Sequence, residues 1–127
     1  MKLHSLTKCS EVDVMTATLA QEQIAENVLK HTYVLCEALL HNYKHQHGGT
    51  QEYKFYPETG RKYHKVIMNA AGSRSVHCFI DKKTGQVYKS ASWKAPAKGV
   101  RYDLRLIADR EWLLENADWC GHYLYAK

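Results

Sequence analysis

The chain has 127 residues, the usual length of a single domain, and a formal net charge of +5 at pH 7. With 45% hydrophobic and 24% charged residues, but only two prolines and seven glycines, it is neither disordered nor collagen-like nor of low complexity. No run of about 18 apolar residues occurs, and the charged N-terminus does not have the pattern of a signal peptide. We therefore expect a cytoplasmic protein that does not enter membranes.

The first predicted element is a long amphipathic helix over residues 18–45. Its apolar stripe contains Ile24, Val28, Leu35 and Leu39 at helical spacing. Thr18 and Gln21 have the form of a capping box, which predicts that the helix begins at Thr18 and ends before Gly48. Residues 1–17 are predicted to form either an arm or a short extra turn.

After Gly49 the pattern changes to short aromatic and β-branched runs. Four strands are predicted, over residues 51–56, 62–69, 75–80 and 86–93. Because the connections between them are short, we expect an antiparallel meander. In the third hairpin, Asp81 should cap its own turn and Gly85 should adopt a positive φ.

A second helix and an aromatic tail complete the chain. Asp103 is predicted to be the N-cap of a helix over residues 103–116, in which Trp112 is mostly buried. Residues 118–126 are predicted to pack on the body or on a second subunit, with Trp119 mostly buried and 123–125 as a candidate strand. The fold class is thus a single α+β domain, residues 1–127, with a long N-terminal helix and a second helix on an antiparallel four-stranded meander.

The four cysteines are spaced 27, 42 and 42 residues apart, so no pair has the C-x-x-C spacing of a zinc ribbon or a redox motif. We predict free, buried thiols in a reducing compartment.

Catalytic and cofactor motifs are absent from the sequence. It has no G-x-S-x-G, Walker loop or G-x-G-x-x-G, and strand alternation is expected to place His77 and Cys78 on opposite faces. We therefore favour a protein that is not an enzyme and that uses no cofactor. An active site assembled from residues distant in the sequence is the alternative.

Histidines near the end of the first helix raise the question of a metal site. His41 and His45 lie four residues apart, which places them on one helical face, with His47 just beyond; Cys120 and His122 would be needed to complete a tetrahedron. A polar helix end, where cationic histidines complement the helix dipole, is the simpler interpretation, so we predict no metal.

Charge is concentrated in the middle of the chain. Residues 51–101 carry a net charge of +8, against −1 before them and −2 after them. The candidate site consists of Lys82, Lys83, Lys89, Trp93, Lys94, Lys98 and Arg101. Cations interleaved with aromatic residues suit phosphate contacts and base stacking, which predicts nucleic-acid binding. The alternatives are lysines that only keep exposed strands from aggregating, an acidic protein partner, or a small anionic ligand.

Two segments of the C-terminal half carry a resemblance. Residues 76–104 (VHCFIDKKTGQVYKSASWKAPAKGVRYDL) and 118–125 (DWCGHYLY) resemble small proteins of tailed bacteriophages that have no established activity. The resemblance implies the cytoplasm of an infected bacterium and assigns no catalytic residue. The order of elements also resembles that of double-stranded-RNA-binding domains, with Lys94, Lys98 and Arg101 in place of their phosphate-binding cations, although that family has three strands.

Together these observations predict a small phage-type binding protein that contacts nucleic acid through a basic sheet and loop. The alternative is an inhibitor that sequesters an acidic bacterial host or defence protein. A homo-oligomer that holds a small anion between its subunits is a third hypothesis.

Overall fold

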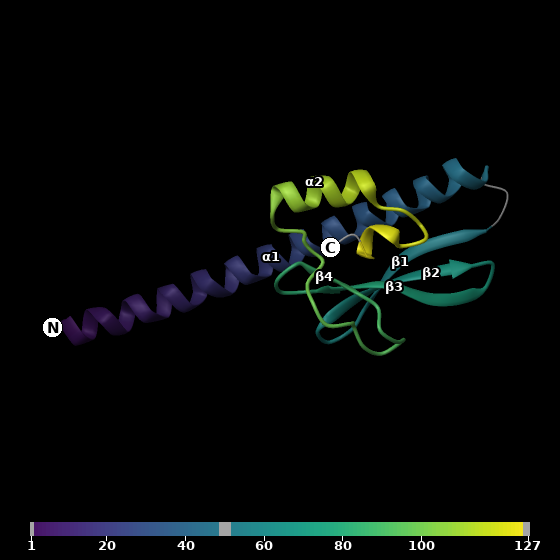
Figure 1. Cartoon of the computed structure of the whole chain (residues 1–127). Helices are drawn as coiled ribbons and strands as arrows, with labels where there is room; N and C mark the ends of the chain where they lie inside the picture. Colours follow the sequence, from purple (N-terminus) through teal and green to yellow (C-terminus); the bar gives the residue numbers. More distant parts are fainter. Residues whose placement is uncertain (1, 49–51, 126–127) are drawn as a thin grey trace.

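The structure, a computed structural model, describes residues 2–48 and 52–125, with side chains from residue 18 onward. It is an α+β fold in which two helices lie on one face of an antiparallel sheet (Figure 1). The strands are β1 (Tyr53–Thr59), β2 (Tyr63–Ala70), β3 (Ser73–Asp81), β4 (Gln86–Lys89) and β5 (Tyr102–Asp103), in that order across the sheet. The helices are α1 (Lys2–His47), α2 (Ile107–Asn116) and the short 3-10 helix η1 (His122–Tyr125). No helix in this part of the chain is long and apolar enough to cross a bilayer.

Helix α1 is longer than predicted. It runs without a break from Lys2, so the predicted start at Thr18 is wrong. A capping box starts a helix only when its first residue lies outside the helical conformation. No proline or glycine before Thr18 interrupts the helix there. The N-terminal part of α1 extends away from the sheet, and only its C-terminal part covers the strands (Figure 1). The predicted arm is therefore a continuation of the helix.

The strands differ from the prediction at three places. Strand β1 continues through Pro57, which was predicted to be in a turn; an edge strand tolerates proline because one side of it needs no hydrogen bonds. Strand β4 ends at Lys89 rather than at residue 93, and residues 90–101 form a loop. That loop returns the chain to β4, where Tyr102 and Asp103 pair with Val87 and Gln86 as the unpredicted fifth strand.

The predicted hairpin turn between β3 and β4 is confirmed. The Oδ1 atom of Asp81 accepts hydrogen bonds from the backbone N–H groups of Lys83 (2.8 Å) and Thr84 (3.1 Å). Gly85 has a φ of 76°. A side chain there would be strained by that φ and would crowd Val28 and Arg105.

The core lies between the sheet and the helices. Its fully buried members include Val28, Leu35 and Leu39 from α1, Val66, Ile80 and Val87 from the sheet, and Leu104 and Leu113. Cys36 and Cys78 are free and buried, as predicted, whereas Cys120 is exposed and contradicts that prediction. Cys9 lies outside the residues whose side chains are described.

The second helix begins later than predicted. Asp103 belongs to β5, and its Oδ1 atom accepts a hydrogen bond from the backbone N–H of Arg105 (2.9 Å), so it stabilises the turn before α2. The N-cap position of α2 is Leu106, which makes no side-chain cap. Trp112 is 42% exposed and stacks on Tyr102, so its predicted burial is wrong; Leu113 takes the buried position instead.

The tail packs on the body, as predicted, through Trp119, Tyr123 and Leu124, whereas Tyr125 is 66% exposed and residue 126 lies outside the described residues. Residues 123–125 belong to η1 and not to a strand. Tyr123 and Leu124 are buried. The Oη atom of Tyr102 donates a hydrogen bond to the backbone carbonyl of Tyr123. Trp119 is partly buried, and its indole N–H donates a hydrogen bond to Oε1 of Gln46 (3.0 Å).

Candidate functional site

The sheet face turned away from the helices, here called the outer face, carries part of the predicted site. Trp93 lies there beside Lys65 of β2 and Arg74 of β3. The Lys65 Nζ atom is 5.0 Å from the Trp93 ring centroid, and the Arg74 Cζ atom is 5.2 Å from it. Arg74 also donates a hydrogen bond to Glu58 of β1. Trp93 is 41% exposed and therefore holds two cations at a surface that a ligand can reach.

Three aromatic side chains extend the outer face along the sheet. The Tyr63 ring meets the rings of Phe79 and Tyr88 edge to face, with centroid distances of 5.6 and 6.1 Å. The Lys62 Nζ atom lies 5.3 Å from the Tyr63 centroid. Phe79 is buried, so it supports this row without offering a surface of its own. The outer face therefore alternates cations with aromatic rings.

The loop of residues 90–101 lies on the side of the sheet opposite the helices (Figure 1). Its backbone is held by hydrogen bonds from Ala97 N–H to the Lys89 carbonyl (2.7 Å) and from Arg101 N–H to the Val87 carbonyl (2.7 Å). Lys94 and Lys98 are exposed on this loop, whereas Arg101 is partly buried at its end. The loop is thus a fixed support for two exposed cations.

Lys82 and Lys83 lie at one end of the sheet, where the β1–β2 and β3–β4 turns approach α1. Lys82 Nζ donates a hydrogen bond to the carbonyl of Gly60 (3.0 Å), which ties the two turns together. A cavity of about 580 Å³ opens here between the turns and α1. Its basic residues are Arg61, Lys62, Lys82 and Lys83.

Lys89 is separated from the other predicted site residues. It pairs with Cys78, a member of the core, and therefore lies on the face of the sheet that the helices cover. Its Nζ atom is 4.3 Å from the Tyr125 ring centroid, and it lines a second cavity, of about 420 Å³, beside η1. The predicted site therefore divides between two faces of the sheet.

A β-bulge determines what else lines this second cavity. The β2–β3 register steps from Val66 opposite Cys78 to Ile67 opposite Val76, so His77 is an extra residue in β3. A bulge breaks strand alternation. The His77 ring consequently contacts Phe55 and Tyr123 on the helix-covered face, where Cys78 is also buried. The prediction that His77 and Cys78 lie on opposite faces is wrong for this reason.

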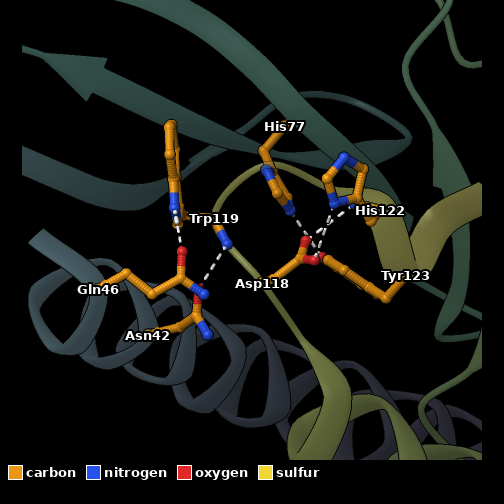
Figure 2. Close-up of polar contacts among 7 residues, drawn as sticks. All are labelled: Asn42, Gln46, His77, Asp118, Trp119, His122 and Tyr123. Atoms are coloured by element: carbon orange, nitrogen blue, oxygen red, sulfur yellow. Dashed lines mark hydrogen bonds and ion pairs between the residues drawn. The ribbon is translucent and has the colours of Figure 1, made fainter.

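His77 belongs to a buried polar cluster (Figure 2). Its Nε2 atom is 2.7 Å from Oη of Tyr123, with which it forms a hydrogen bond, and the two rings stack at 5.6 Å. Burial lowers the pKa of His77 to about 4, although the Asp118 carboxylate acts in the opposite direction. Burial, followed by the neighbouring Cys78, raises the pKa of Tyr123. Both side chains are therefore neutral at physiological pH.

Helix α1 and the tail hold this cluster in place (Figure 2). Oδ1 of Asn42 accepts a hydrogen bond from the Trp119 backbone N–H (3.1 Å). Asp118 Oδ1 accepts one from the backbone N–H of His122 (2.8 Å), and its Oδ2 lies 3.5 Å from His122 Nδ1. Sequence reasoning missed the cluster because the bulge has no sequence signal and Tyr123 is distant along the chain.

The histidines near the end of α1 do not converge. His41 and His45 are exposed, and the His47 ring stacks on Tyr43 at a centroid distance of 4.7 Å. Among the side chains that the structure describes, no group of three or more His, Cys, Asp or Glu residues is arranged to hold a metal ion.

Comparison with known proteins places the chain in a family. Residues 12–126 match the family of unknown function DUF7717. The chain belongs to this family. The match spans all five strands, α2 and every residue of both cavities. No curated protein and no solved structure matches the chain.

Proposed function

We propose that the protein binds nucleic acid, with little sequence preference, through the outer face and the loop of residues 90–101. The observation that carries this proposal is the trio of Trp93, Lys65 and Arg74. Lys94 and Lys98 are exposed on the loop that follows the same side of the sheet. Cations held at fixed positions suit a phosphate backbone, whose contacts carry affinity without sequence information.

The distribution of acidic residues supports the same choice of surface. Glu22, Glu26 and Glu37 are exposed on α1, and Glu111 and Glu115 are exposed on α2. On the outer face, Glu58 is already paired with Arg74. With Asp109 included, and Lys30, Lys44 and Arg110 set against these acids, the described side chains of the two helices keep a net charge of −3, so a polyanion is attracted to the sheet rather than to the helices.

Binding should be measured by fluorescence anisotropy with labelled single-stranded and duplex oligonucleotides between 50 and 250 mM salt. Each phosphate contact releases counterion, so Lys94→Ala and Lys98→Ala should each lower the log–log salt slope by roughly 0.7 to 0.9. Lys30→Ala, which removes an exposed cation from α1, is the matched control and should leave the slope unchanged.

Two results would contradict the proposal. One is no binding to any oligonucleotide at low salt, and the other is binding whose affinity does not change with salt. If nuclease-treated bacterial lysate instead yields one stoichiometric protein partner, the predicted inhibitor of a host or defence protein becomes the better explanation, because the same cations would steer an acidic protein.

A further inference from the structure

The cavity of about 420 Å³ beside η1 has a composition suited to an organic anion. Lys89 is partly buried at its wall and forms no ion pair within the described parts of the chain. Its Nζ atom lies over the exposed Tyr125 ring, 4.3 Å from the centroid, and a bound anion would add an ionic partner to this cation–π contact. Asp118, the nearby acid, does not line the cavity and is engaged with His122.

Hydroxyl and imidazole groups accompany this cation. Ser75 and Ser90 line the cavity from β3 and from the start of the loop. The Ser90 hydroxyl donates a hydrogen bond to the Ser92 carbonyl (3.2 Å), so it must exchange this partner to donate to a ligand. His77 also lines it, with Nε2 occupied by Tyr123 and its second ring nitrogen available to a ligand. One ammonium group and two hydroxyls match the several acceptor oxygens of a phosphate group better than the two oxygens of a carboxylate.

Apolar side chains form the remaining walls. They are Met68, Trp119, Leu124 and Tyr125. The volume lies within the usual range for small-molecule sites, which combine apolar walls with a few placed polar groups. The apolar walls can therefore contact the organic part of a ligand, while the polar groups bind its anionic group.

We propose that this cavity binds a phosphate monoester of nucleotide size, with its phosphate at Lys89, Ser75 and Ser90 and its organic body against Met68, Trp119 and Leu124. The bulge at His77 builds the site, because it turns the imidazole from the outer face into the cavity wall. The site is independent of the outer face, since Lys89 lies on the opposite side of the sheet from Trp93. A free nucleotide and the phosphorylated end of a strand share this chemistry.

The test measures the binding of uridine 5′-monophosphate to the full chain by calorimetry and by changes in amide chemical shifts. Binding should perturb the amides of residues 75–77, 89–90 and 119–125. Uridine without the phosphate should bind at least tenfold more weakly. Lys89→Met keeps the apolar stem but removes the charge, and it should weaken binding of the monophosphate at least tenfold. The Lys30→Met variant should bind as the unaltered chain does.

The set of amides whose chemical shifts change, here called the shift map, is measured on the unaltered chain. It therefore tests the proposal even if Lys89→Met does not fold. No perturbation at millimolar monophosphate, perturbation elsewhere, or equal binding of uridine would overturn it. A trinucleotide with a 5′-phosphate that reproduces the shift map, where its 5′-hydroxyl form does not, identifies strand ends as ligands; binding of the monophosphate alone identifies free nucleotides. If the cavity fails this test while the salt slopes of Lys94→Ala and Lys98→Ala hold, only the cavity proposal is lost.

Discussion

The two faces of the sheet use the same strands for different purposes. On β2, Val66 is fully buried beneath the helices, whereas Lys65, one residue earlier, lies over the Trp93 ring on the outer face. Strand alternation keeps these functions apart, because neighbouring residues point in opposite directions. The outer face can therefore change its charge without disturbing the core.

The exception is the bulge at His77. There the chain places a polar side chain among Phe55, Tyr123 and Cys78, on the face that carries the apolar core. A hydrogen bond to Tyr123 and a neutral imidazole make this burial tolerable. The helix-covered face thus contains a core and, at its edge, a polar site.

The largest difference between the faces should appear in stability. Leu39→Ala removes a fully buried side chain beneath the sheet and should lower the free energy of unfolding by about 2 to 5 kcal/mol. Trp93→Ala should lower it by less than about 2 kcal/mol, because that ring is partly exposed. Urea unfolding measures both, with the exposed Leu19→Ala as the helix control. An equal loss of unfolding free energy for Trp93→Ala would show that the outer face forms a second core.

Acid should act on the helix-covered face through His77. Its folded pKa of about 4 lies below the ordinary value of 6.5, so its contribution to stability is complete above pH 6.5 and is lost as the pH falls toward 4. The loss should reach about 3 kcal/mol, since each pKa unit corresponds to about 1.4 kcal/mol.

The pKa values of His64 and His31 are also lowered by burial and add to the acid destabilisation with the same sign. Comparison of unfolding free energies with those of His77→Gln between pH 7 and 4 isolates the contribution of His77. Parallel pH profiles for the two proteins would show that His77 titrates normally.

The smallest effect is expected on the outer face. Glu58→Gln breaks an ion pair whose two side chains are 49% and 41% exposed, and it should cost less than about 1 kcal/mol at low salt. The cost should disappear in 0.5 M salt, where exposed charges are screened. Thermal unfolding at both salt concentrations provides the measurement, and a large loss that salt does not reduce would contradict the expected solvation of this face.

Local signals predicted much of the fold. The stripe through Val28, Leu35 and Leu39 gave the helix that covers the sheet, and Asp81 with Gly85 gave the β3–β4 turn, because each signal operates within a few residues. Strand β5 was missed because two residues make no periodic pattern and pair only when the loop returns them to β4.

The candidate sites were predictable to different degrees. The charge distribution along the chain indicated that Lys94 and Lys98 are exposed, since a loop rich in cations is exposed by its own composition. The same charge distribution grouped Lys89 with Lys94 and Lys98, although the pairing of β4 with β3 turns the Lys89 side chain to the other face. Composition records how much charge a segment has, while register decides the direction in which each side chain points.

Helix α1 has one more consequence, which concerns the shape of the molecule in solution. Its 46 residues span about 69 Å at 1.5 Å per residue, whereas a compact chain of this length has a radius of gyration of about 14 Å. The projecting end in Figure 1 therefore makes the protein a rod attached to a small body. Such a particle tumbles anisotropically and sediments more slowly than a sphere of equal mass, so its hydrodynamic radius exceeds the value that its sequence length would suggest.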